Sequence, residues 1–203
     1  MAPVMAAQTD VVTEEDGLRA DLYDLLGALL ANPPSRELLD QVSGLTGDDG
    51  ELGRAVGALA RVAKSMTPKA AEAEFNALFV GLGRGELLPY ASYYMTGFLN
   101  EKPLAVLRND MARLSIQRSA TVYEPEDNIA SLCEMMAGLI RGRFGEPTDV
   151  LGQRDFFNTH LGPWGQHFFT DLEGAKGSVL YAPVGAIGRA FMEIEREAFR
   201  MGA

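Results

Sequence analysis

The sequence predicts an all-α, single-domain protein, a bundle of eight or more helices, and three observations support this prediction. Apolar residues recur at helical spacing along most of the chain, whereas β-branched residues nowhere alternate with polar ones over a strand length. Prolines and glycines interrupt these periodic stretches. The composition, with 47% hydrophobic and 23% charged residues, is typical of a globular protein that buries one sizeable core.

The positions at which apolar residues show helical spacing indicate the domain organisation. Residues 1–13 are expected to form a loose N-terminal arm, and residues 14–203 a single all-helical domain. No internal repeat and no linker divide that domain, because the loop from Gly44 to Gly50 is too short to separate two cores.

The helices are expected in the following order. A stripe of leucines from Leu18 to Leu30 predicts a first long amphipathic helix, which ends at Asn32-Pro33-Pro34. Further helical patterns cover residues 52–66, 68–79, 104–114, 129–140, 155–160, 165–172 and 184–198.

Several residues suggest where these helices begin and what their faces meet. Thr67 and Pro68 are typical of an N-cap followed by proline at the first helical position, and Pro125 fits the start of the helix over 129–140. The glycine-rich residues 80–91 are expected to form a loop. Glu193, Glu195 and Glu197, with arginines nearby, are interpreted as a solvated helix face.

Charge and cysteine content restrict the class of protein. The net charge of −10 and the pI near 4.7 disfavour nucleic acid as a partner and favour cationic ones. The single cysteine, Cys133, cannot form an internal disulfide, and the N-terminal residues resemble no secretory leader, so the cytoplasm is the expected location. No stretch is apolar enough for an integral membrane segment.

No motif indicates catalysis, a metal site or a cofactor. The two histidines, His160 and His167, belong to no metal-ligand motif, and Cys133 lies in an apolar helical pattern where it is interpreted as a small buried hydrophobe. The residues therefore predict no enzyme activity, no metal and no cofactor. One alternative is a helical nucleotide-binding protein or enzyme that uses the loop Gly81–Glu86, although no strand precedes these glycines and no Lys-Ser/Thr follows them.

Two segments carry patterns that suggest ligand binding. Leu87–Tyr94 places three tyrosines beside a proline, a combination suited to an apolar peptide or, alternatively, to the interface of an oligomeric helical scaffold. Tyr123–Ile129 places three carboxylates at the entrance of a helix, where they are expected either to cap the helix or to hold an arginine-rich ligand.

Both segments resemble motifs of the TorD/DmsD family of redox-enzyme maturation chaperones. The motifs stand here as Glu74-Phe75-Asn76-Ala77-Leu78-Phe79-Val80-Gly81, Pro89-Tyr90-Ala91-Ser92-Tyr93-Tyr94, Glu124-Pro125-Glu126-Asp127-Asn128-Ile129 and Phe156-Phe157-Asn158-Thr159-His160-Leu161-Gly162-Pro163-Trp164. The resemblance covers residues 18–200 and is dense from 72 to 167. It departs from the family pattern at Asn128, where the family usually has histidine, and at Gly81-Leu82-Gly83, where the family has a Gly-Pro-Gly turn.

The resemblance implies an all-helical cytoplasmic chaperone. Such a protein would bind the twin-arginine signal peptide and the body of a molybdopterin-containing oxidoreductase precursor until its cofactor is inserted and before export. It further implies that Pro89, Tyr90, Ser92 and Tyr94 line or shape a peptide groove and that Glu124, Pro125, Asp127 and Ile129 form its acidic wall. Asn128, at the position of the family's histidine, is expected among the peptide-binding residues as well. A monomer and a domain-swapped dimer are both compatible with the sequence, which does not identify the client enzyme.

Overall fold

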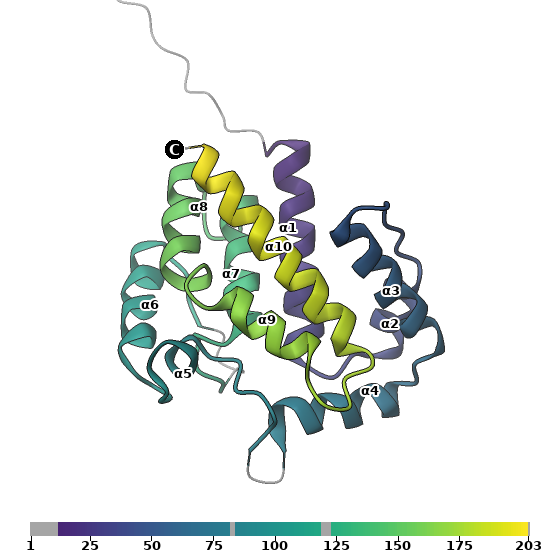
Figure 1. Ribbon diagram of the computed structural model, residues 1–203. Helices are drawn as coiled ribbons and strands as arrows, with labels where there is room; N and C mark the ends of the chain where they lie inside the picture. The colour runs from purple at the N-terminus through teal and green to yellow at the C-terminus, as the bar shows by residue number, and fades with distance from the viewer. Residues whose placement is uncertain (1–11, 82–83, 119–122, 203) are drawn as a thin grey trace, which may run out of the picture.

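The computed structural model describes residues 12–81, 84–118 and 123–202, and within them it confirms the all-α prediction (Figure 1). These residues form ten α-helices and two short π-helical turns, with no strand. The elements are α1 Glu14–Ala31, α2 Arg36–Ser43, α3 Glu51–Ser65, α4 Pro68–Phe75, η1 Asn76–Val80, α5 Ala91–Thr96, α6 Lys102–Arg113, α7 Ile129–Arg141, α8 Val150–Phe156, η2 Phe157–Leu161, α9 Gly165–Glu173 and α10 Tyr181–Met201.

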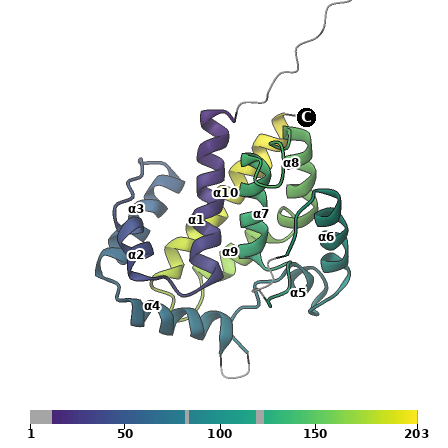
Figure 2. The ribbon, with the colours of Figure 1, turned by 180° about the vertical axis from the view of Figure 1, so that it is seen from behind.

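Three long helices make up the centre of the molecule. Helix α1 packs against α7, and α10 packs against α9 and α3, as the two opposite views show (Figures 1 and 2). Helices α2 and α3 pack together at one side of the bundle, while α5 and α6 pack together at the other. The described part of the chain contains no helix with both the length and the hydropathy needed to cross a bilayer.

Helix α7 is the most deeply buried helix of this arrangement. Ten of its thirteen residues are buried, among them Cys133, which confirms the interpretation of that thiol as a core residue. Burial also raises the pKa of the Cys133 thiol, so a reactive thiolate is disfavoured there. The helix ends at Gly142, whose φ of 69° is the left-handed conformation that glycine adopts readily.

The start of α7 corrects one prediction. Pro125 was expected at the beginning of this helix, but the helix begins at Ile129 and Asn128 is its N-cap. The Asn128 side chain accepts a hydrogen bond from the Ala130 amide at 2.9 Å. Since asparagine is a strong N-cap residue, it competes successfully with the proline for the helix start, and Pro125 lies in the preceding turn.

Two short helices, α2 and α5, were not predicted, because eight and six residues are too few for an apolar period to be recognised. The non-helical stretch before α5 agrees with the loop expected over 80–91, except that residues 82 and 83 lie outside the described residues. Residues 1–11 of the expected N-terminal arm also lie outside them. Leu18, the first residue of the leucine stripe, is 61% exposed rather than buried.

A buried ionic network links α1 to α10 and corrects the prediction for Glu195. This carboxylate is only 1% exposed, whereas it was expected on a solvated face with Glu193 and Glu197. It accepts hydrogen bonds from Arg19 Nε at 2.7 Å and from the Tyr23 hydroxyl at 2.9 Å. Residues two apart lie on opposite sides of a helix, so Glu195 faces inward when its neighbours face water.

Candidate functional site

The two segments singled out in the sequence lie side by side at the entrance of α7. Tyr90 and Asn128 form an isolated antiparallel bridge. The Ala91 amide donates to the Asp127 carbonyl at 2.9 Å, and the Ile129 amide donates to the Pro89 carbonyl at 2.8 Å. Backbone hydrogen bonds therefore fix the proline-tyrosine segment against the acidic segment, although more than thirty residues separate them in sequence.

Asp127 lies below the surface of this junction. It is 1% exposed, and its Oδ2 accepts hydrogen bonds from the amide of Ser92, at 2.8 Å, and from the Ser92 hydroxyl. Ser92 is itself buried, as are Pro89 and Ile129. In this conformation a ligand meets none of these four side chains at the surface, and they hold the segments in place.

Glu126 is already paired within the protein. It is buried and accepts hydrogen bonds from Arg108 Nε at 3.1 Å and Nη2 at 2.8 Å, while Arg118 lies 3.6 Å away. Burial alone would raise the pKa of Glu126, but the hydrogen bonds and charges of the two arginines hold it below its usual value. Only Glu124 of the three acids is therefore exposed.

Glu124 and Tyr90 form the accessible part of the junction. The Tyr90 hydroxyl donates a hydrogen bond to Glu124 Oε2, and burial of the ring together with this bond raises the pKa of Tyr90. The hydroxyl is neutral, so the negative charge of Glu124 is oriented by this contact without being neutralised. Pro125 is half-buried in the turn beside it.

Tyr94 belongs to a different surface. Its hydroxyl donates to Asp171 on α9 at 2.9 Å, and its ring centroid lies 5.3 Å from that of Trp164 and 5.9 Å from that of Phe168. Burial and the bond to Asp171 raise the pKa of Tyr94. Tyr94 therefore anchors α5 to α9 and lines neither of the two cavities described next.

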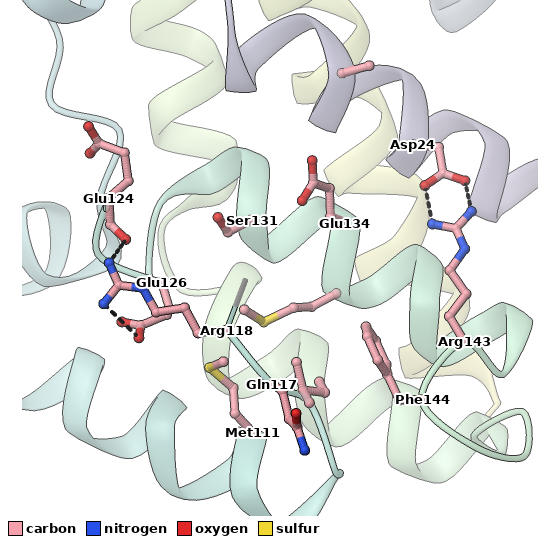
Figure 3. Close-up of a pocket in the computed structure, with 13 residues that line it drawn as sticks. Asp24, Met111, Gln117, Arg118, Glu124, Glu126, Ser131, Glu134, Arg143 and Phe144 are labelled. Atoms are coloured by element: carbon pink, nitrogen blue, oxygen red, sulfur yellow. Dashed lines mark hydrogen bonds and ion pairs between the residues drawn. The ribbon is translucent and has the colours of Figure 1, made fainter. Parts of the chain in front are cut away.

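Two adjoining cavities open beside Glu124, along the contact between α1 and α7. One has a volume of about 540 Å³ and the other about 480 Å³, and both are lined by Glu124, Ser131 and Glu134. Figure 3 shows the larger cavity, with Glu124 near one end and Arg143 near the other. Its apolar lining residues are Ala28, Met111, Ile116, Met135 and Phe144, and the smaller cavity adds Ala31, Asn32, Tyr123, Asn128 and Ala130.

Glu134 is the lining residue that sequence reasoning missed. A signal for it exists, because it is the only charged residue between Ile129 and Ile140 in an otherwise apolar helix. An isolated charge in such a helix faces solvent or a cavity, since burial without a partner would be costly. Asp24 and Arg143 were missed as well, and their positions depend on contacts between distant segments.

The remaining polar candidates do not form a metal centre. Among the described residues, no group of three histidine, cysteine or acidic side chains could hold a metal ion. His160 is buried and its Nε2 lies 2.8 Å from Asp110 Oδ2. Burial lowers the pKa of His160 although the Asp110 carboxylate opposes that shift, so the imidazole is a neutral structural group at neutral pH.

Comparisons with known proteins identify the family. The model of a family described as "Nitrate reductase delta subunit" matches residues 46–170, more than half of the chain. The chain belongs to this family. It is also 27% identical over 201 residues to the chaperone protein TorD of Vibrio atlanticus (strain LGP32), covering 88% of this chain and 93% of that protein. These findings confirm the resemblance to the TorD/DmsD family that the motifs indicated.

Two further comparisons agree with this assignment. The chaperone protein TorD of Aliivibrio salmonicida (strain LFI1238) is 26% identical over 171 residues, which cover 74% of this chain and 80% of that protein. A crystal structure described as a redox enzyme maturation protein from Archaeoglobus fulgidus matches with a TM-score of 0.59 at 20% identity, covering 87% of this chain and 94% of that one. At this identity the structural likeness supports the fold alone.

Proposed function

We propose that this protein is a cytoplasmic maturation chaperone without catalytic turnover. Its ligand would be the twin-arginine signal peptide, together with the body, of a molybdopterin-containing oxidoreductase precursor, held until cofactor insertion and before export. Membership of the family and the name of the TorD relatives support the chaperone function. The exposed Glu124, oriented by Tyr90 at the mouth of two cavities, is the observation that supports peptide binding.

The chemistry of the junction suits such a leader. A twin-arginine signal combines two guanidinium groups with an apolar stretch, and its receptor needs carboxylates beside apolar surface. Glu124 supplies a carboxylate, while the larger cavity supplies methionine and phenylalanine side chains. The net charge of −10 would steer a cationic peptide toward the protein, so salt should weaken the association.

The nine predicted site residues would divide into two roles. Tyr90, Glu124 and Asn128 would contact the peptide, because they are accessible or line a cavity. The others would position them: Pro89, Ser92, Tyr94, Pro125, Asp127 and Ile129. Asn128 caps α7 where the family usually has histidine, so this contact would lack a histidine's change of charge.

A titration tests the proposal directly. Calorimetry would compare a synthetic peptide carrying Arg-Arg and an apolar stretch with the same peptide carrying Ala-Ala. We expect the wild-type protein to prefer the arginine peptide, and Glu124→Gln to weaken its binding by about tenfold, the loss expected for one charge-assisted hydrogen bond. Glu72→Gln on α4 is the matched control, since Glu72 is exposed and lines neither cavity.

The peptide titration and two further measurements distinguish the proposal from the alternatives. Equal binding of both peptides would refute the proposal. A nucleotide-binding protein would instead give heat with nucleotides that is lost on Gly83→Ala. An oligomeric scaffold would change its mass by light scattering on Tyr90→Ala.

A further inference from the structure

The larger of the two cavities is lined by more negatively than positively charged side chains. The ion pairs around it show which carboxylates lack a cationic partner among the described residues. Its lining includes four carboxylates and two guanidinium groups. Arg143 is paired with Asp24, whose Oδ1 lies 2.8 Å from Arg143 Nη1 and whose Oδ2 is bonded to Nη2. At the other end Arg118 lies beside Glu126 (Figure 3), and Arg108 Nη2 lies 2.8 Å from Glu126 Oε2.

Two carboxylates, Glu124 and Glu134, have no cation bound to them in the described part of the chain. Among the described residues, the Glu124 carboxylate accepts a hydrogen bond from the neutral hydroxyl of Tyr90, whereas Arg118 Nη2 donates to the Glu124 backbone carbonyl at 3.3 Å. Glu134 makes neither a hydrogen bond nor an ion pair with another described residue. Both line both cavities, with Ser131 between them along the chain.

Two glycines make room for side chains that line this cavity, Gly27 for Glu134 and Gly138 for Phe144. A Cβ added at Gly27 on α1 would lie 3.0 Å from Glu134 Cγ, so the bare backbone of α1 leaves room for the stem of this side chain. A Cβ added at Gly138 on α7 would lie 2.3 Å from Phe144 Cε2, so the Phe144 ring lies where that side chain would otherwise be. Figure 3 shows Glu134 on α7 below α1, with Phe144 beneath the same helix.

Glu134 is exposed at the mouth of the cavities, yet its environment disfavours the negative charge of its carboxylate. Desolvation, followed by the negative charge of Asp24, raises the pKa of Glu134, although Arg143 opposes this shift. The carboxylate therefore gains more from an added cation than one in an existing ion pair. The apolar lining also favours a guanidinium over an ammonium ion, because guanidinium is more weakly hydrated and stacks on aromatic side chains such as that of Phe144.

We propose that Glu134 and Glu124 are paired receptors for two arginine side chains of one bound segment, with Glu134 binding its guanidinium inside the cavity between α1 and α7. This inference rests on the proposed function and adds a residue outside the predicted site. Two uncompensated carboxylates match the charge of an arginine pair, whereas Glu126 is already paired with arginines of the protein. Asp127 is buried beneath the junction, where its Oδ2 is bonded to Ser92 and its Oδ1 has no hydrogen-bond partner among the described residues, so a surface ligand does not reach it.

The experiment is a cycle between protein and peptide variants. Four peptides would carry Arg-Arg, Arg-Ala, Ala-Arg or Ala-Ala before the same apolar stretch. They would be titrated into the full-length wild-type protein, Glu134→Gln, Glu124→Gln and the charge-matched control Glu72→Gln. We expect Glu134→Gln to weaken Arg-Arg binding about tenfold, as for one lost charge-assisted contact.

The cycle also identifies the partner of Glu134. One of the two single replacements of arginine by alanine in the peptide should weaken its binding to the wild-type protein about tenfold. The same replacement should weaken binding to Glu134→Gln by less than about twofold, because that variant already lacks the contact. The replacement of the other peptide arginine should likewise weaken binding to the wild-type protein but hardly affect binding to Glu124→Gln. Circular dichroism should give the wild-type spectrum for each variant.

Each result decides between the inference and the function beneath it. Should Glu134→Gln bind the Arg-Arg peptide within twofold of wild type while Glu124→Gln is impaired, this inference is overturned and the proposed function stands. Should wild type and Glu72→Gln fail to prefer Arg-Arg over Ala-Ala, both are overturned.

Discussion

Two carboxylates that lie beside helix α1 have opposite environments in the fold. Glu195 on α10 is buried and receives hydrogen bonds from Arg19 and Tyr23, both on α1. Glu134 on α7 lies in a cavity next to another face of α1, and its neighbour Arg143 is bound to Asp24 instead. The fold thus satisfies one carboxylate completely and gives the other no hydrogen-bond or ion-pair partner among the described residues, which distinguishes the structural role of Glu195 from the binding role proposed for Glu134.

The largest expected effect is on stability, at Glu195. Glu195→Ala removes the acceptor of Arg19 Nε and Nη2 and of the buried Tyr23 hydroxyl, while Arg19 Nη1 keeps its bonds to Asp16 and Gln153. We expect the free energy of unfolding to fall by about 3 kcal/mol, the lower end of the loss for a broken buried ion pair. Urea denaturation would measure this loss. Glu193 lies two residues earlier in the same helix and forms an ion pair with Arg196 at 3.1 Å on the surface. Glu193→Ala should therefore lower the free energy of unfolding by less than about 1 kcal/mol. Similar losses for both variants would contradict the structural role of Glu195.

A smaller loss of stability is expected at the junction. Ser92→Ala removes one of the two hydrogen bonds that the buried Asp127 Oδ2 accepts and keeps the other, from the Ser92 amide, so unfolding should become easier by about 1–3 kcal/mol. Ser65→Ala is the control, because the Ser65 hydroxyl donates to the Val62 carbonyl at an exposed position and bonds no buried group of the described chain. If Ser92→Ala melted like wild type, Asp127 would not be the support that the contacts indicate.

The junction also shows how far the sequence could predict the site. The residue types of Pro89–Tyr94 and Glu124–Ile129 suggested two complementary segments, and the structure does bring them together. The sequence could not tell which acid faces outward. That choice depends on Ser92 bonding Asp127, on Arg108 bonding Glu126 and on Asn128 capping α7, and two of these are contacts between distant segments.

The helices were more predictable than the side-chain environments. The long apolar periods of α1, α3, α7 and α10 were recognised because burial of one helix face imposes a regular spacing. The same reasoning failed for Glu195, since a run of alternating acids looks solvated until the neighbouring helix is known. Charged residues inside a fold are placed by their partners, and those partners lie far away in sequence.

A third prediction concerns the shape of the cavity. Gly138→Ala would push the Phe144 ring away from α7, and because that ring can move we expect a stability loss of only about 1 kcal/mol. Affinity for the arginine peptide should change more than stability, since Phe144 lines the cavity. Thermal melts and calorimetry on the same sample would separate the two effects.

The control for Gly138→Ala is Gly17→Ala on helix α1, the helix that also carries Asp24. A Cβ at Gly17 would meet no atom within 4 Å, and alanine is the better helix former. Gly17→Ala should therefore raise stability slightly and leave peptide affinity unchanged. An unchanged affinity in Gly138→Ala as well would remove Phe144 from the binding surface.

The smallest expected effect is a change in stability on substitution of Glu134. It is informative because removing this carboxylate should stabilise the protein, whereas removing that of Glu195 should destabilise it. Desolvation and the charge of Asp24 raise the pKa of Glu134 in the folded protein, so folding favours its protonated form. This contribution to stability is fully present below the carboxyl's unfolded pKa and is lost as the pH rises through the raised folded value. Glu134→Gln removes that loss, and at neutral pH it should melt slightly above wild type, by less than about 1 kcal/mol in the free energy of unfolding. The difference should shrink toward pH 4, whereas a lower melting temperature for Glu134→Gln at neutral pH would show that the carboxylate has a stabilising partner and is not held available for a ligand.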